Sequence, residues 1–258
     1  MRRINDVWAY KDMITSLVKR ELRGRYKGSV LGFFWTLINP LFQIIIYTIV
    51  FSYIMRAGID DYYLFLFVAL VPWIFFSASI HAGSGCIWSQ KAMINKIYFP
   101  RAVLPIAHVI GQLINMLLSF IVVFFILIVM GKTINIIALT IFPIIVLIEF
   151  ILALGMTFMV SSISVFFPDL MQILGVAVML WQFLTPIMYE VNSVPEHMKI
   201  YFKLNPMTTI IEAYRDILYY AKVPNVNNIF VAIALSIVVL CIGWIVFGVL
   251  EKKFSEVL

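Results

Sequence analysis

The stretch IIALTIFPIIVLIEFILALGMTFMVSSISVFF at residues 136–167 contains one charged side chain, Glu149, and it decides the class of the fold. An α-helix rises about 1.5 Å per residue, so about 20 apolar residues cross the hydrocarbon core of a bilayer. Similar runs occupy residues 30–55, 62–80, 102–130, 170–188 and 229–250. The sequence therefore predicts an all-α integral membrane protein with six transmembrane helices.

The composition agrees with this class. The chain is 63% hydrophobic and 12% charged, whereas soluble domains contain about 25% charged residues. Its net charge of +6 indicates membrane topology and contact with anionic lipid, and we expect no nucleic-acid partner. Cys86 and Cys241 fall at the end of the second run and inside the sixth, so we expect them to pack without a disulfide or a metal.

The distribution of basic residues predicts the orientation. Most of the 19 Lys and Arg residues precede the first run or lie in the second connection and at the C-terminus. With six spans these segments share one side of the membrane. Basic loops stay in the cytoplasm, so we expect a multi-pass protein with both termini cytoplasmic. The first span is expected to serve as the insertion signal, because the charged residues before it lack an apolar signal core.

Residues 1–29 are predicted to form a cytoplasmic amphipathic helix ahead of the six-helix domain at 30–258. Ile14, Leu17, Val18 and Leu22 recur at helical spacing, with cations on the other faces. This pattern is typical of an interfacial helix lying among lipid headgroups, although a solvated helix whose cations fix the topology is the alternative.

The second cytoplasmic connection, residues 83–101, is richer than a turn requires. Met93, Ile94 and Ile97 are expected to share one face, while Lys91 and Lys96 project elsewhere. An amphipathic helix of this kind can dock into a groove on a partner. The alternative is a connector whose apolar side rests on the bilayer.

Residues 190–225 form the longest external connection, and we expect a lid of two short re-entrant helices. Ser193 with Glu196, and Thr209 with Glu212, match the capping-box pattern that begins a helix. The predicted helices run to about Phe202 and Tyr220. Irregular backbone at this depth must pack on protein or line a watery cavity.

Polar residues within the spans are few, and they do not form a catalytic set. Glu149 lies near the middle of its span, where it has either a functional role or an interhelical hydrogen bond. Gln112 and Asn115 are expected to bond between helices. Gly131, Lys132 and Thr133 imitate the end of a phosphate-binding loop, but its earlier glycine is replaced by Ile126, so we expect no nucleotide here.

Several runs together resemble the polysaccharide-export permeases of ABC transporters, which export O-antigen, capsular polysaccharide or teichoic acid. The runs are RYKGSVLGFFW (25–35) with Asn39–Pro40, KIYFPR (96–101) with Leu104–Pro105, LTPI (184–187), NPM (205–207) and IEAYR (211–215). They follow the family order over nearly the whole chain. One departure is Pro168, beside Asp169, where the family commonly has arginine.

The resemblance implies a transport subunit of the bacterial plasma membrane that is not itself an enzyme. Two copies would join two copies of a separate ATPase, which would hold ATP and magnesium, so this chain would carry no cofactor or metal. The substrate would be a lipid-linked polysaccharide such as an O-antigen or a capsule-like glycan. A teichoic acid exporter is the alternative, and a drug or lipid exporter permease is a further one. A membrane-embedded transferase should instead show a carboxylate or histidine constellation at one membrane face.

The resemblance also assigns expected roles to residues. The aromatic and amide residues expected along the substrate channel are Trp181, Gln182, Phe183, Tyr189, Trp35, Tyr47, Phe51 and Trp73. The residues expected to contact the ATPase are Lys91, Ile94, Lys96, Ile97, Tyr98, Phe99, Arg101 and Asp169. The residues expected at the external gate are Thr209, Glu212, Tyr214 and Arg215. Span five is expected to kink at Thr185–Pro186, beside the channel aromatics.

Overall fold

The computed structural model describes residues 7–26, 35–50 and 58–257, which contain helices and no β-strand. The α-helices are α2 (Lys11–Tyr26), α3 (Trp35–Thr48), α4 (Tyr62–Ser84), α5 (Lys91–Ile94), α6 (Val103–Val129), α7 (Ile136–Ser164), α8 (Leu170–Phe183), α9 (Lys199–Leu204), α10 (Pro206–Leu218), α11 (Val226–Leu250) and α12 (Phe254–Val257). Short 3₁₀ turns are η3 (Trp88–Gln90), η4 (Val191–Ser193), η5 (Glu196–Met198) and η6 (Glu251–Lys253).

Four helices in the described ranges are long and apolar enough to cross a membrane: α4, α6, α7 and α11 with its η6 extension. They fall on the predicted runs at 62–80, 102–130, 136–167 and 229–250. Helix α8 occupies the fifth run but is a shorter apolar helix. Helix α3 lies within the first run. The prediction of an all-α protein with long apolar helices is confirmed, and the count of six spans stays a prediction.

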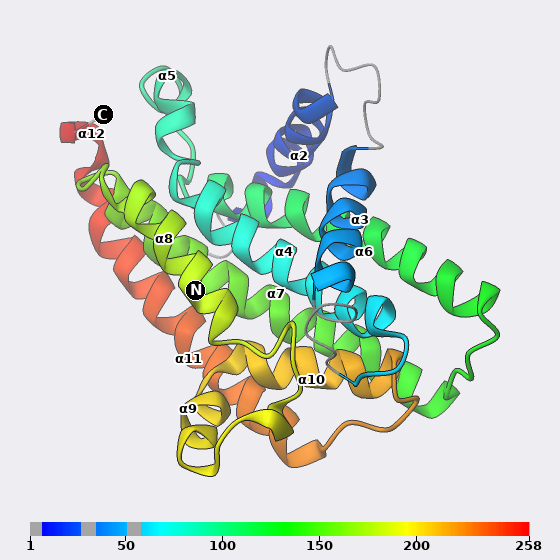
Figure 1. Cartoon of the computed structure of the whole chain (residues 1–258). Helices are drawn as coiled ribbons and strands as arrows, with labels where there is room; N and C mark the ends of the chain where they lie inside the picture. Colours follow the sequence, from blue (N-terminus) through cyan, green and yellow to red (C-terminus); the bar gives the residue numbers. More distant parts are fainter. Residues whose placement is uncertain (1–6, 27–34, 51–57, 258) are drawn as a thin grey trace.

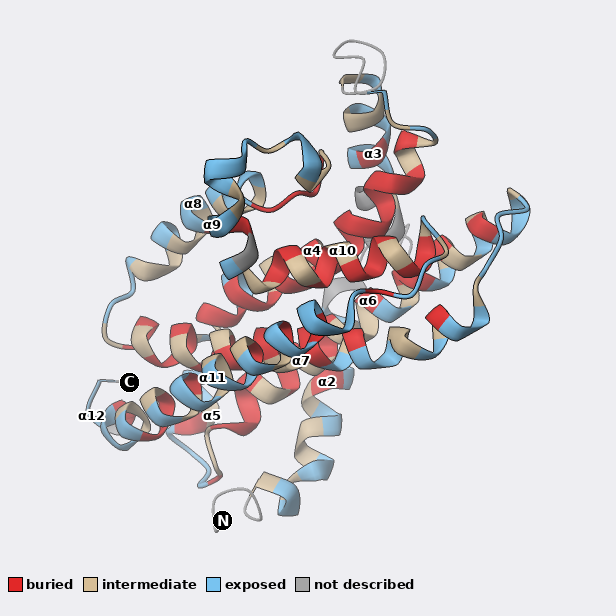
Figure 2. Cartoon of the chain, turned by 90° about the horizontal axis from the view of Figure 1, so that it is seen from below, coloured by how far each residue is buried: buried red, intermediate tan, exposed pale blue. Residues whose placement is uncertain are grey.

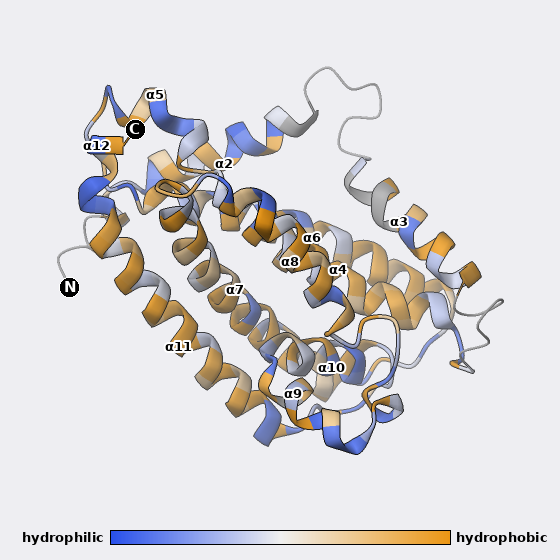
Figure 3. Ribbon diagram, turned by 60° about the vertical axis from the view of Figure 1, so that its left-hand side comes forward, coloured by the Kyte–Doolittle hydropathy of each residue, from blue (hydrophilic) through white to orange (hydrophobic). Residues whose placement is uncertain are grey.

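Helix α4 forms the centre of the fold and packs against α3, α6, α7, α8 and α10. Most of its side chains are buried, as Figure 2 shows in red. A helix that is apolar on every side is suited to this place, because it has no polar face to turn outward. Helices α6 and α11 bury much smaller shares of their apolar windows. Both helices have exposed apolar side chains, which suit contact with lipid, and their ribbons are mostly orange, that is hydrophobic, in Figure 3.

The long helices run between two ends of the molecule (Figure 1), and the two ends differ in charge. One end carries α2, α5 and α12, and we call it the basic end because Lys19, Arg20, Lys91 and Lys96 lie there. The other end carries α9, α10 and the connections before α4 and after α6, and we call it the loop end. At the loop end the side chains of Asn135, Asn205 and Asn225 cap the N-termini of α7, α10 and α11.

The turn that imitated a phosphate-binding loop ends a helix instead. Gly131 follows α6 with φ of +63°, a left-handed conformation that glycine adopts without strain. The N–H of Gly131 donates to the carbonyl of Ile128, and the N–H of Lys132 donates to that of Leu127. These bonds satisfy carbonyls that the helix end would leave free. The Lys132 ammonium pairs with Asp61 in the connection before α4.

The two predicted capping boxes do not begin the external helices. Helix α10 begins at Pro206, where the Asn205 side chain accepts the N–H of Met207, and Thr209 lies inside the helix. Asparagine before proline is the stronger start, since it caps the helix and proline fits its first turn. The segment after Ser193 forms η5 and then α9. Glu196 pairs with Lys199 at 2.6 Å, and no side chain within the described ranges caps η5 or α9.

The second connection also differs from the prediction of one shared apolar face. Helix α5 ends at Ile94, and the chain turns there through bonds from the N–H groups of Lys96 and Ile97 to the carbonyl of Met93. Ile94 is 9% exposed and packs with Phe99 in a cluster at the basic end, whereas Ile97 is 59% exposed. The helix is too short to carry both isoleucines on one face, so they point to different surroundings.

Candidate functional site

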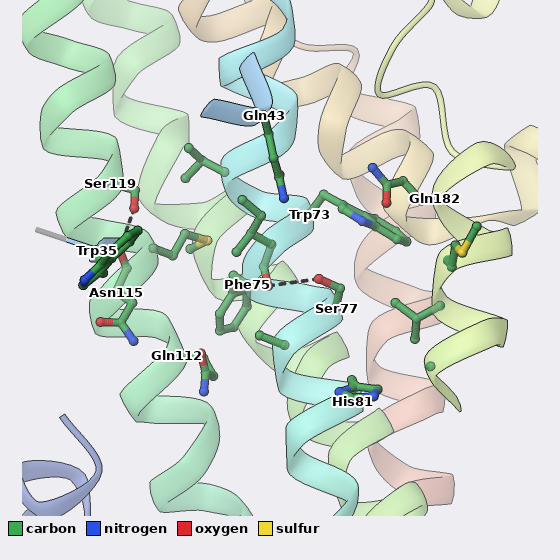
Figure 4. A pocket seen from close by; sticks show the side chains of 17 residues that line it. Trp35, Gln43, Trp73, Phe75, Ser77, His81, Gln112, Asn115, Ser119 and Gln182 are labelled. Atoms are coloured by element: carbon green, nitrogen blue, oxygen red, sulfur yellow. Dashed lines mark hydrogen bonds between the residues drawn. The ribbon is translucent and has the colours of Figure 1, made fainter. Parts of the chain in front are cut away.

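A cavity of about 680 Å³ lies between α3, α4, α6 and α8. Figure 4 shows the side chains that line it, which come from all four helices. Its polar and indole side chains are Trp35, Gln43, Trp73, Ser77, His81, Gln112, Asn115, Ser119 and Gln182. The cavity therefore brings side-chain amides and tryptophans together within the apolar body of the protein.

Helical spacing places these side chains. Gln112, Asn115 and Ser119 are three and four residues apart on α6, so they follow one another along a single face. Trp73, Ser77 and His81 repeat every four residues on α4 and form a second wall. Helix α8 adds Gln182 and α3 adds Gln43, which Figure 4 shows across from each other in the view. These spacings can be read from the sequence, but the sequence does not show which helices face one another.

The lining suits a hydroxyl-rich ligand. A side-chain amide both donates and accepts hydrogen bonds, so it can serve a hydroxyl in either role. An indole ring offers an apolar face for C–H groups and an N–H donor at its edge. Within the described ranges, no group of three or more His, Cys, Asp or Glu residues is placed to hold a metal ion. The cavity can therefore exchange hydrogen bonds with a ligand and cover its C–H groups.

Three of the eight predicted channel residues, Trp35, Trp73 and Gln182, line this cavity. Trp181 instead packs edge-on against Phe76, with ring centroids 5.2 Å apart. Phe183 is exposed, and the Tyr189 hydroxyl donates to its carbonyl at 2.6 Å. Tyr47 packs against the core. Phe51 lies outside the described residues.

The predicted kink of span five is wrong, because α8 ends before it. Its last residue is Phe183, and the Thr185 hydroxyl donates back to the carbonyl of Trp181 at 2.9 Å. Pro186 has no N–H with which to continue the helix. The chain then turns toward α10, where Asn205 donates from its amide to the Thr185 hydroxyl at 3.0 Å. Helix and loop thus meet at the loop end of the cavity.

Helix α2 is connected to the cavity wall by hydrogen bonds. The Glu21 carboxylate lies 2.9 Å from Nδ1 of His108 and accepts the Gln112 side-chain N–H at 3.2 Å. Gln112 is also a lining residue. The apolar stripe of α2 packs toward α6 and the basic-end cluster through Ile14 and Leu17. The sequence pattern alone indicates no role for Glu21, because only the packing of α2 on α6 brings its partners near.

The predicted gate residues occupy two different surroundings. Thr209 and Glu212 line a second cavity, of about 490 Å³, at the loop end. Tyr214 is fully buried, and its hydroxyl donates to Oε2 of Glu149 at 2.8 Å. Of the two roles open to Glu149, the structure shows the interhelical hydrogen bond, which fastens α10 to α7.

Arg215 is 3% exposed and is surrounded by backbone carbonyls. Its guanidinium donates to the carbonyl oxygens of Pro186 at 2.5 Å and Ile187 at 2.6 Å, and it lies 3.5 Å from the ring centroid of Phe65. Burial lowers the pKa of Arg215 from 12.5 to about 10, so it stays charged at neutral pH. It holds the segment after α8 against α4 and α10.

The predicted coupling residues all lie at the basic end, but only some face outward. Tyr98 is 95% exposed, and Ile97, Lys91, Lys96 and Asp169 are also exposed. The buried or half-buried members are Ile94, Phe99 and Arg101; the Arg101 guanidinium donates to the carbonyl of Glu251 at 2.5 Å and lies 5.8 Å from the Phe254 ring. Arg101 thereby ties the connection to the C-terminal helices.

Taken together, the apolar helices and the amide-lined cavity are those of a helical membrane protein with a polar cavity between its helices. Residues 13–219 match the family described as ABC-2 type transporter. The chain belongs to this family.

Several relatives match along most of the chain. The O-antigen export system permease protein RfbA of Myxococcus xanthus is 32% identical over 260 residues, covering 99% of both chains. A protein of the same name from Klebsiella pneumoniae is 29% identical and covers 96% of this chain and 95% of its own. The polysialic acid transport protein KpsM of Escherichia coli is 26% identical and covers 80% of this chain and 81% of its own.

Proposed function

We propose that this chain is the permease subunit of an ATP-driven exporter that moves a lipid-linked polysaccharide across the bacterial plasma membrane. The amide and indole lining of the 680 Å³ cavity is the observation that carries the proposal, because these groups suit sugar hydroxyls and C–H faces. Relatives named for O-antigen and polysialic acid export support the substrate class.

The subunit works as a homodimer with two copies of a separate ATPase, which binds ATP and magnesium. Two facing copies would close the sides of the cavity that one chain leaves open. Each chain crosses the membrane six times, with α3 and α8 belonging to the first and fifth spans. The basic end faces the cytoplasm, because Lys and Arg concentrate there. Residues 190–225 then form a lid on the outer side.

Export supplies the test. Deleting the gene should remove the polysaccharide from the cell surface, and the wild-type gene should restore it. We expect Gln182→Leu to restore less surface polymer, by about two- to twelvefold, since one hydrogen bond contributes about 0.5–1.5 kcal/mol. The measurement is surface polymer at equal membrane levels of the permease.

Gln172→Leu is the matched control. Gln172 lies on the same helix, is exposed and does not line the cavity, so this change should leave export at the wild-type level. Unchanged surface polymer after deletion of the gene would contradict the proposed function. Equal export by the two variants would contradict the role of the cavity.

The exposed tip of the second connection is the expected contact with the ATPase. Ile97→Asp should uncouple ATP hydrolysis from export by at least tenfold, because a carboxylate is costly to bury in an apolar groove. The ATP hydrolysis of the co-purified complex and polymer export are measured together. Ile97→Val is the control, as it keeps a branched apolar side chain. Full coupling in Ile97→Asp would exclude this contact.

Ile94 does not serve this test, although the sequence pattern predicts it on the same face as Ile97. Because Ile94 is buried in the basic-end cluster, an aspartate there would damage the fold whether or not an ATPase docks. A change at the exposed Ile97 can therefore test docking of the ATPase without damage to the fold.

A further inference from the structure

The second cavity, of about 490 Å³, lies at the loop end between α10, the segment around η4 and the start of α11. Pockets that hold small ligands measure about 300–1,000 Å³. Its lining is rich in polar side chains, including Glu212 and Asp216 on α10 and Asn228 on α11. It is separate from the cavity of about 680 Å³ between α3, α4, α6 and α8, here called the membrane cavity, since the two share no lining residue.

Glu212 and Asp216 stand one helical turn apart on α10, so both carboxylates lie along the same wall. Both are half-buried, and neither carboxylate accepts a hydrogen bond from a residue within the described ranges. Burial raises the pKa of each carboxyl above its ordinary value. Half-buried carboxylates of this kind favour a ligand that brings hydrogen-bond donors.

Other lining groups of the cavity complement these carboxylates. Asn192 and Asn228 line it and can each donate or accept a hydrogen bond. The Tyr220 hydroxyl donates to Glu190 at 2.9 Å, which leaves an aromatic ring fixed at the cavity. A ring with fixed orientation can cover the C–H face of a sugar.

The charge of the lining limits which chemical classes of ligand can bind. Three carboxylates, those of Glu190, Glu212 and Asp216, face two cations, those of Arg215 and Lys222. The excess of negative groups disfavours an anion, so phosphate-bearing lipid headgroups and acidic sugars fit poorly. Neutral hydroxyls and ammonium groups fit well, because both are donors to carboxylates.

The position of the cavity relates it to the membrane cavity. Arg215 lines it and also binds the carbonyls of Pro186 and Ile187, which follow the helix that carries Gln182. One short segment therefore joins the walls of the two cavities. Both cavities are therefore lined by residues of the same connected part of the fold, which makes a shared ligand physically reasonable.

We propose that this loop-end cavity is a second saccharide site, which binds a neutral or amino sugar unit of the exported glycan on the outer side of the membrane. Glu212 and Asp216 accept the sugar's donors, and Tyr220 supports its apolar face. The inference rests on the proposed export of a polysaccharide. It adds a binding role to a region that otherwise only closes the path.

The test uses right-side-out membrane vesicles containing the full chain with Cys86 and Cys241 replaced by alanine and with the reporter change Thr209→Cys. An impermeant maleimide should label the reporter from outside. The host strain's surface polysaccharide, freed of lipid by mild acid, should protect it. Glu212→Gln and Asp216→Asn should each raise the protecting concentration at least tenfold. Asp60→Asn, an exposed acid at the same end outside the cavity, should not.

Several results would overturn the site. These are labelling only from the cytoplasmic side, no protection by the polysaccharide, equal protection in the carboxamide variants, and equal protection by glycerophosphoethanolamine, which represents a lipid headgroup. The first two need neither carboxamide variant, so they stand even if those variants fold poorly. If the polysaccharide gives no protection but the wild-type gene still restores surface polymer, only this site is rejected. If deletion of the gene leaves the surface polymer unchanged, the export function is rejected.

Discussion

Replacing Arg215 by methionine is expected to abolish most of the folded permease. The change leaves the carbonyls of Pro186 and Ile187 without the donors that bind them at 2.5 and 2.6 Å. A buried acceptor without a partner costs about 1–3 kcal/mol, so two such groups cost about 2–6 kcal/mol. Native proteins are stable by only about 5–15 kcal/mol. The measurement is the yield and melting temperature of monodisperse permease in detergent.

Arg215→Lys should recover part of this loss. A lysine ammonium keeps the charge but is a single point donor, whereas the planar guanidinium donates to several carbonyls at once. Lys199→Met is the surface control, because Lys199 pairs with the exposed Glu196 and this pair should contribute less than about 1 kcal/mol. A variant Arg215→Met with wild-type yield and melting temperature would show that water satisfies these carbonyls.

The position of Arg215 explains why the loop end is built around α10. Tyr214 reaches Glu149 on α7, while the next residue, Arg215, reaches the segment after α8. Adjacent residues of one helix thus fasten two different parts of the fold. A helix that lies between spans can make both contacts, and removal of either residue frees one part while the other stays attached. Variants of the two residues should therefore differ in which segment loosens.

The apolar runs could be predicted from sequence because the bilayer imposes one length and one chemistry on every span. Helices α6 and α7 begin within one residue of the predicted 102–130 and 136–167. Boundaries near the loop end were less predictable, because several signals compete there. Asn205 with Pro206 prevailed over Thr209 with Glu212, and Pro186 ended α8 instead of bending it. Local patterns mark possible helix starts, while tertiary contacts select among them.

The candidate site was only partly predictable for a related reason. Most of the predicted channel residues are aromatic, and the aromatic character of a residue does not say whether its face of the helix meets a cavity. Trp73 lines the cavity and Trp181 packs against Phe76, although both are tryptophans in apolar runs. The amides Gln112 and Asn115 were expected to bond between helices, and the structure places both on the cavity wall. Gln112 does both, since it also donates to Glu21.

Gly243→Ala is expected to separate α7 from α11 and to lower the stability of the permease. A Cβ at Gly243 would lie 2.1 Å from the carbonyl oxygen of Gly155, and a Cβ at Gly155 would lie 2.6 Å from Cα of Leu240. Both obstacles are backbone atoms, so no side chain can rotate away. Overpacking costs about 1–3 kcal/mol, and a backbone clash belongs at or above the upper limit.

The close approach is what holds these helices together in lipid. Lipid tails are as apolar as the side chains, so helices associate through van der Waals packing between small residues. Melting of the purified permease, and cross-linking between α7 and α11, measure the expected loss. Because α7 carries Glu149, which binds α10, the separation should also disturb the loop end.

Gly24→Ala is the matched control for this prediction. The same methyl group there meets no atom within 4 Å, and alanine favours a helix over glycine by about 0.5–1 kcal/mol, so this variant should be neutral or more stable. The two changes add the same group and are expected to act with opposite sign, because only one of them meets a neighbouring backbone. Equal stability of both variants would mean that α7 and α11 can part at no cost, and that their glycines are not what determines the contact.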